Sequence, residues 1–183
     1  MKPAALLLAP GASADRNHSS LRAIESAVAP MPVARIDLPN RPPAAIQRIR
    51  DEAAVLLAEH HTSPKALALG GRSYGGRMCS MAVAEGLPAA ALVLLSYPLH
   101  PPGKPDALRV EHFGALNVPC LFVSGTKDPF GTPAELERHA KTIPGPVTHV
   151  WIDGGGHAFK GRDADVAEHV HQWLRGLGPS RKR

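Results

Sequence analysis

Short apolar runs alternate along this chain with stretches in which apolar residues recur every three or four positions. The runs cover residues 4–9, 32–38, 66–69, 91–95, 120–124 and 147–152. Several are apolar throughout instead of alternating with polar residues, which is typical of strands buried on both faces of a parallel sheet. We therefore predict about six strands, most of them parallel.

Helical periodicity fills the segments between these runs. Four apolar stripes carry it: Leu21, Ile24 and Val28; Ile46, Ile49, Ala53 and Leu56; Met78, Met81 and Ala82; and Val166, Val170, Trp173, Leu174 and Leu177. Strands and helices in strict alternation favour a doubly wound α/β sheet with helices on both faces. No repeat or linker divides the chain, so we predict one domain over residues 1–178 and a flexible basic tail at residues 179–183.

Composition adds little to this picture. The 183 residues are 44% hydrophobic and 20% charged, as in an ordinary soluble domain, with a formal net charge of +5. Part of that charge lies at residues 181–183, where no aromatic residues are interleaved with the basic ones. This favours a solvated chain end over the alternative, a contact with nucleic acid or a membrane surface.

Two features bear on the compartment. The N-terminal apolar run ends at Pro10 and Gly11, which favours a first core strand over a signal peptide, and no apolar segment is long enough to span a bilayer. Cys79 and Cys120 lie in apolar stretches and match no metal-binding spacing, so we expect two small buried side chains. We expect a cytoplasmic protein without a disulfide framework.

The strongest local signal is the segment GGRSYGGR at residues 70–77. Gly71, Ser73 and Gly75 form a G-x-S-x-G pattern between an apolar run and a helical stripe, which is the context of a nucleophile elbow. Such a turn exposes the serine hydroxyl on a strained backbone, and glycine two positions away on either side avoids a collision. The alternatives are a glycine-rich turn with an incidental serine and a phosphate-binding loop, although the Lys-Ser or Lys-Thr pair of the Walker pattern is absent.

Two later residues provide the partners that a serine nucleophile needs. Asp128 follows the run at 120–124, and His157 follows the run at 147–152 on a glycine-rich loop. The order Ser, Asp, His is the one expected for an elbow of this kind. A histidine takes the serine proton, and the carboxylate orients the imidazole. We predict Ser73 as nucleophile, His157 as base and Asp128 as orienting acid; the rival acid, Asp153, is expected to anchor the loop before His157.

The other candidate site residues are predicted from their positions relative to the nucleophile and to the ends of the predicted strands. The backbone N–H groups of Tyr74, after the nucleophile, and of Ala12, after the first strand, are the expected oxyanion donors. The proline-rich segment at residues 96–118 leaves a strand's carboxyl end and should border the site. Candidate substrate-binding residues near this crevice are Arg72, Pro98, His100, His112, Lys127 and Phe130. Surface solvation is the plainer explanation for the charged ones.

Three segments carry a resemblance to a known family: residues 70–77, YPLHPPGKP at 97–105, and GTKDPFG at 125–131. With the strand order, they resemble the small α/β-hydrolases related to dienelactone hydrolases and to the hydrolase-like domain of a chromatin-complex subunit. The resemblance covers nearly the whole chain. It implies the triad Ser73, Asp128 and His157 and a compact core without a large cap domain. The chain departs from it where relatives often carry His-Gly and this sequence has Pro10 and Gly11.

We therefore expect a serine hydrolase that cleaves a small ester, thioester or lactone through an acyl-enzyme. Its partner would be a small-molecule acyl substrate, with no cofactor and no metal. One alternative is a non-catalytic binding or scaffold protein of the same fold, because fold alone does not prove activity. Another is a nucleotide-binding α/β protein that uses the glycine-rich loop as a phosphate nest.

Overall fold

Six parallel strands form one sheet in the computed structural model, which describes residues 2–178. The strands are β1 (Ala5–Ala9), β2 (Val33–Arg35), β3 (Leu67–Arg72), β4 (Ala91–Leu95), β5 (Cys120–Gly125) and β6 (Val147–Ile152), in the spatial order β2-β1-β3-β4-β5-β6. Every neighbouring pair is parallel, which confirms the predicted sheet. The predicted tail at residues 179–183 lies outside the described residues.

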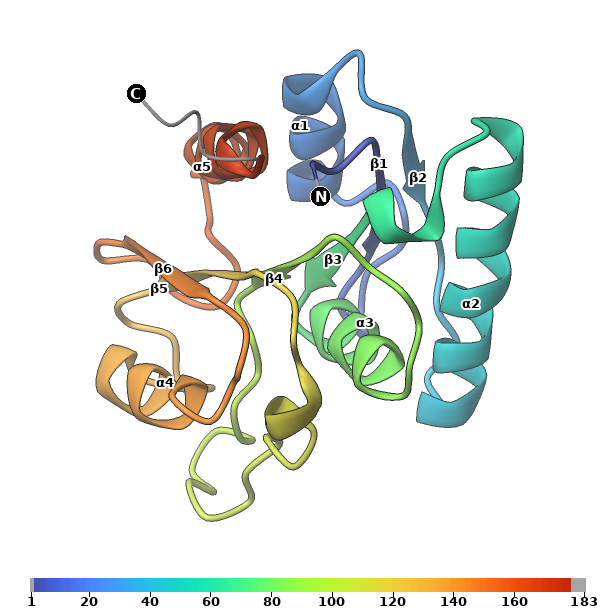
Figure 1. Cartoon of the computed structure of the whole chain (residues 1–183). Helices are drawn as coiled ribbons and strands as arrows, with labels where there is room; N and C mark the ends of the chain where they lie inside the picture. The colour runs from blue at the N-terminus through green and yellow to red at the C-terminus, as the bar shows by residue number, and fades with distance from the viewer. Residues whose placement is uncertain (1, 179–183) are drawn as a thin grey trace, which may run out of the picture.

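Five helices cover both faces of the sheet, as predicted (Figure 1). They are α1 (Ser19–Val28), α2 (Pro42–Glu59), α3 (Tyr74–Ala84), α4 (Pro133–Ala140) and α5 (Asp163–Gly176), with single 3₁₀ turns η1 (Pro64–Ala66) and η2 (Phe113–Ala115). Helices α1 and α5 pack on one face, and α2, α3 and α4 on the other. The central strands β1, β3, β4 and β5 are almost fully buried, because helices cover them on both sides.

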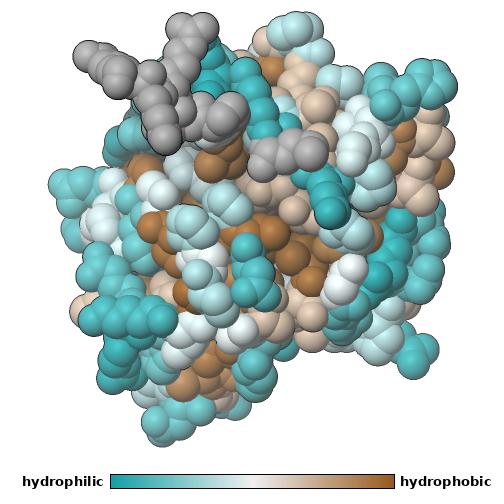
Figure 2. Space-filling view, viewed as in Figure 1, coloured by the Kyte–Doolittle hydropathy of each residue, from teal (hydrophilic) through white to brown (hydrophobic). Residues whose placement is uncertain are grey.

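The surface agrees with this layering. In the view of Figure 2, hydrophilic side chains lie around the margins and hydrophobic ones gather near the centre, between the helices. Among the large hydrophobic side chains of the described part, Val55 on α2 is the one that is exposed to solvent. Within residues 2–178, no helix combines the length and the apolar character needed to cross a membrane.

The order of the strands creates a crevice at their carboxyl ends. From β1 the chain first moves outward to β2 and then returns to β3 on the other side of β1. Loops that leave neighbouring strands in opposite directions leave a gap, and open α/β sheets bind their ligands there. The turn after β3 carries Ser73, so the fold places this serine at the switch point.

Close packing of the turn depends on Gly75. A Cβ at this position would overlap the carbonyl oxygens of Ala9 and Pro10, which are backbone atoms that cannot rotate away. We expect Gly75→Ala to lower the free energy of unfolding by about 1–3 kcal/mol or more, because overpacking against backbone forces the helix away from the sheet. Denaturant titration measures this. Gly114→Ala is the matched control, since no heavy atom lies within 4 Å of its added Cβ; equal losses in both variants would contradict the packing argument.

His112 provides a second test of the core, through pH. Its Nε2 lies 2.8 Å from Ser80 Oγ, and burial, aided by the Arg77 charge, lowers its pKa to about 4. An unfolded histidine titrates at about pH 6.5, so the unfolded chain binds the extra proton first as pH falls. Stability present above about pH 6.5 is therefore lost progressively towards pH 4.

We expect this loss to amount to about 1–2 kcal/mol between pH 7 and 4.5, after allowance for solvent screening. His112→Gln should lose less stability over the same interval, because glutamine does not titrate. Urea unfolding at the two pH values measures the difference. His169→Gln, at an exposed position, should keep the full wild-type loss. An unchanged pH dependence in His112→Gln would contradict the assignment.

Candidate active site

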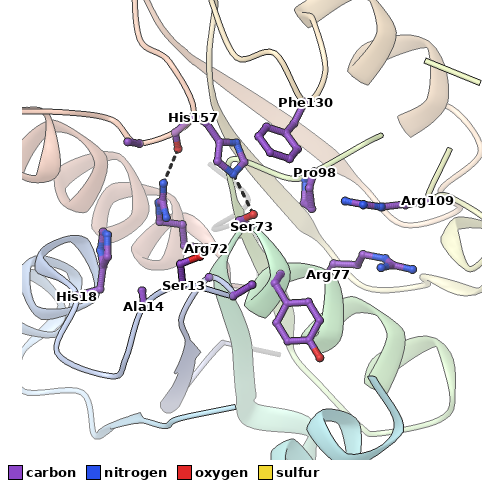
Figure 3. Close-up of a pocket in the computed structure, with 14 residues that line it drawn as sticks. Ser13, Ala14, His18, Arg72, Ser73, Arg77, Pro98, Arg109, Phe130 and His157 are labelled. Atoms are coloured by element: carbon purple, nitrogen blue, oxygen red, sulfur yellow. Dashed lines mark hydrogen bonds between the residues drawn. The ribbon is translucent and has the colours of Figure 1, made fainter. Parts of the chain in front are cut away.

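Ser73 lies on the sharp turn between β3 and α3. Its backbone has φ +50° and ψ −116°, a strained conformation for a residue with a Cβ. The turn is held because the Ser73 N–H donates to the carbonyl oxygen of Leu95 on β4 at 2.8 Å. A serine at a helix start usually caps the helix with its hydroxyl. Ser73 makes no such bond, and its Oγ lies 2.9 Å from Nε2 of His157 instead (Figure 3).

His157 lies on the loop between β6 and α5, where contacts on several sides fix its orientation. Its Nδ1 lies 2.8 Å from Oδ2 of Asp128, and its ring stacks on Phe130 with centroids 4.0 Å apart. Its carbonyl oxygen accepts hydrogen bonds from Ser96 Oγ at 2.9 Å and from a guanidinium nitrogen of Arg72 at 2.8 Å. Movement of this loop would therefore break contacts with residues at the carboxyl ends of β3, β4 and β5.

Asp128 is the buried end of this chain of hydrogen bonds. It lies in the turn after β5 with only 4% of its surface exposed. The Phe130 N–H donates to its Oδ1 at 2.9 Å and so fixes the plane of the carboxylate. The rival acid Asp153 is exposed and accepts a hydrogen bond from Thr126 Oγ1 at 3.4 Å, which ties together the loops after β5 and β6.

The two expected oxyanion donors both line the cavity in front of Ser73, which has a volume of about 640 Å³. Among the described residues, neither the Ala12 N–H nor the Tyr74 N–H has a hydrogen-bond acceptor. Tyr74 is also the first residue of α3, so the positive end of the helix dipole faces the cavity. The arrangement can therefore receive negative charge beside the serine hydroxyl.

The structure divides the candidate substrate-binding residues into two groups. Arg72, Pro98 and Phe130 line the cavity. His100, His112 and Lys127 do not. His100 is buried with Nδ1 bonded to the Pro101 carbonyl, His112 is bonded to Ser80, and the Lys127 side chain is exposed. Arg72 also has a role that its position in the sequence did not reveal, because it holds the carbonyl of the His157 loop.

Sequence reasoning assigned no role in the site to several residues that line the cavity, among them Ser13, Ala14, His18, Arg77, Arg109 and Ala158. A signal for Arg77 was present, because it lies four residues after Ser73 and hence one helical turn further along α3. Arg109 lies in the proline-rich segment that was expected to border the site, but nothing in that segment singles it out.

The structure describes no cluster of three or more His, Cys, Asp or Glu side chains that could hold a metal ion within residues 2–178.

A parallel α/β sheet with a serine on a strained strand-to-helix turn, and with His and Asp on later loops, is the architecture of the α/β-hydrolase class. The chain belongs to the family described as alpha/beta hydrolase domain, which matches residues 2–177. This confirms the predicted fold and the resemblance to small α/β-hydrolases. The link to a chromatin-complex subunit stays a prediction.

Individual relatives support the fold. Epoxide hydrolase A of Mycobacterium tuberculosis (strain ATCC 25618 / H37Rv) is 40% identical over 63 residues, which are 34% of this chain and 20% of that protein. The structure of dienelactone hydrolase from Anabaena variabilis ATCC 29413 has a TM-score of 0.77 at 19% identity, over 96% of this chain and 87% of that one. Est1E from Butyrivibrio proteoclasticus has a TM-score of 0.73 at 16% identity, over 96% and 88%.

Proposed function

We propose that this protein is a serine hydrolase that cleaves a small ester, thioester or lactone through an acyl-enzyme. The observation that carries the proposal is the continuous relay of 2.9 Å from Ser73 Oγ to His157 Nε2 and 2.8 Å from His157 Nδ1 to Asp128. A serine hydroxyl becomes nucleophilic when a neighbouring base takes its proton, and this relay supplies the base and its orienting acid.

In the first half of the reaction, Ser73 Oγ attacks the substrate carbonyl carbon while His157 Nε2 takes the hydroxyl proton. The carbonyl oxygen becomes an oxyanion, which the N–H groups of Ala12 and Tyr74 stabilise. The tetrahedral intermediate collapses, the bond to the leaving group breaks, and the imidazolium of His157 donates its proton to that group. Ser73 is left as an acyl ester.

In the second half, a water molecule takes the place of the leaving group. His157 removes its proton, and the hydroxide attacks the acyl carbon. The second oxyanion collapses, Ser73 Oγ leaves and recovers its proton from His157, and the free acid departs. Asp128 stays ionised throughout and stabilises the imidazolium in both halves.

Steady-state and pre-steady-state kinetics on p-nitrophenyl esters of graded acyl length test this proposal. We expect turnover with an initial burst of p-nitrophenol of up to one equivalent per protein, because an activated ester acylates the serine and releases the alcohol faster than water releases the acid. The length that gives the highest kcat/KM defines the acyl pocket. A well-folded protein that neither bursts nor turns over any of these esters would favour the alternative, a non-catalytic binding protein of the same fold.

A further inference from the structure

Two arginines on one side of the cavity at Ser73 have no acidic partner. Arg77 lies on α3, and Arg109 lies on the loop between β4 and β5. Figure 3 shows their side chains beside Pro98, on the side of Ser73 away from Arg72. Within residues 2–178, neither guanidinium forms an ion pair. Five other arginines of the described part are paired with carboxylates, namely Arg16, Arg35, Arg48, Arg50 and Arg162. Those without an ion pair outside the cavity, Arg22, Arg41, Arg138 and Arg175, are exposed to solvent, whereas Arg77 and Arg109 are not.

The unpaired arrangement costs free energy. Both side chains are half-buried, and the buried Nε of Arg77 has no hydrogen-bond acceptor in the described part of the chain. Burial lowers the pKa of Arg109, and the Arg77 charge lowers it further. Like charges repel more strongly where water is partly excluded, and unpaired buried donors lose their hydration. A bound anion would relieve both costs.

Arg72, the third arginine of the cavity, differs in its surroundings. Its buried Nε also has no hydrogen-bond acceptor in the described part of the chain, but its guanidinium donates to the His157 carbonyl, and the carboxylates of Asp128 and Asp163 oppose the lowering of its pKa by burial. Its charge therefore has acidic neighbours, and its task in the structure is to hold the histidine loop. The free positive charge of the cavity is concentrated at Arg77 and Arg109.

The backbones of both free arginines are held in place. The Arg109 N–H donates to the Leu99 carbonyl at 2.9 Å, and the Arg109 carbonyl accepts from the Tyr97 hydroxyl at 2.7 Å. The Arg77 N–H donates to the Ser73 carbonyl at 3.0 Å, so this arginine is tied to the nucleophile itself. Such anchoring reduces the entropy lost when a ligand is bound.

We propose that Arg77 and Arg109 bind a carboxylate on the substrate, so that the preferred substrate is an ester or lactone bearing a free acid group. The inference rests on the proposed function, because the subsite is defined by its place beside the Ser73 hydroxyl. A guanidinium presents paired N–H donors that match the two oxygens of a carboxylate. Pro98 and Phe130, which line the same cavity, provide apolar surface for the carbon chain between the acid and the scissile bond.

Pairs of substrates that differ only in this charge test the inference. The mono-p-nitrophenyl esters of succinate, glutarate and adipate are compared with their methyl-capped forms, after subtraction of spontaneous hydrolysis. A second pair, 4-acetoxybenzoic acid and its methyl ester, carries the charge on the leaving alcohol. We expect kcat/KM to be about tenfold or more higher for the acid in at least one pair, from hydrogen bonds to a charged group.

Variants assign the preference to the two arginines. Arg109→Met and Arg77→Met should each remove most of it, chiefly through the acid's kcat/KM, while Arg109→Lys, which keeps a charge, should retain part. Arg22→Met is the matched control, because it removes one exposed positive charge from α1; it should leave the preference unchanged. Equal kcat/KM for acid and methyl ester in every pair, or a preference that survives in Arg109→Met, overturns the subsite and leaves the hydrolase proposal standing.

Binding is measured separately from turnover. Calorimetric titration of Ser73→Ala with monomethyl adipate should show binding that is about tenfold or more weaker when Arg109→Met is added. If the wild type hydrolyses none of the esters but this carboxylate-dependent binding is present, the hydrolase proposal fails and the anion subsite stands. No difference in binding between the two backgrounds overturns the subsite.

Discussion

Ser73→Ala is expected to lower kcat for p-nitrophenyl ester hydrolysis by about 10⁴-fold or more, because the hydroxyl is the atom that forms the covalent intermediate. Alanine has the same Cβ as serine, so the backbone at position 73, with φ +50°, is equally strained in both proteins. The free energy of unfolding should therefore stay within about 0.5 kcal/mol of the wild type. The burst of p-nitrophenol should disappear.

The control for this variant is Ser26→Ala, at an exposed position on α1. It removes a hydroxyl of the same kind and should leave kcat unchanged. Stopped-flow kinetics on purified, folded protein provides the measurement. If Ser73→Ala retained a burst and wild-type kcat, a different group would have to be the nucleophile.

Asp128→Asn should lower kcat by about 10³- to 10⁴-fold through the tautomer of His157. The Phe130 N–H donates to Oδ1 of Asp128, so the amide oxygen of an asparagine would keep this bond and its NH₂ group would face Nδ1 of His157. Nδ1 must then accept, and the ring proton moves to Nε2. A protonated Nε2 cannot take the proton of Ser73.

Asp153→Asn distinguishes this account from the rival assignment of the acid. Asp153 is exposed and bonded to Thr126, and its amide analogue should keep kcat within about twofold of the wild type. Measurement of kcat for both variants with one ester decides between them. A large loss in Asp153→Asn together with a small one in Asp128→Asn would reverse the two roles.

The sequence predicted the sheet well because its central strands are buried on both faces and therefore apolar without interruption. Helix α4 was missed, because it is short and buries only Leu136 and Ala140. Its signal was nevertheless present: Thr132 and Glu135 form a capping box, with Pro133 at the first helical position. A search for caps as well as for periodicity would have found it.

The sequence pattern predicted some residues of the candidate site and not others. Ser73, Asp128 and His157 each follow an apolar run, so their convergence at one edge follows from parallel topology. The arginine pair could not be found this way. Arg109 reaches the cavity because the loop after β4 folds back and pairs residue 109 with Leu99, and this long-range contact leaves no periodic pattern. No periodic pattern indicated that the side chain of His100 is buried either.

The most direct test of the proposed nucleophile is covalent labelling with a fluorophosphonate, followed by peptide mapping by mass spectrometry. This reagent phosphonylates serines that a neighbouring base activates, with loss of fluoride, and its adduct reports the atom that attacks. We predict one adduct per protein, on Ser73, and none on folded Ser73→Ala. An adduct on another residue, or no adduct on folded wild-type protein, would contradict the account.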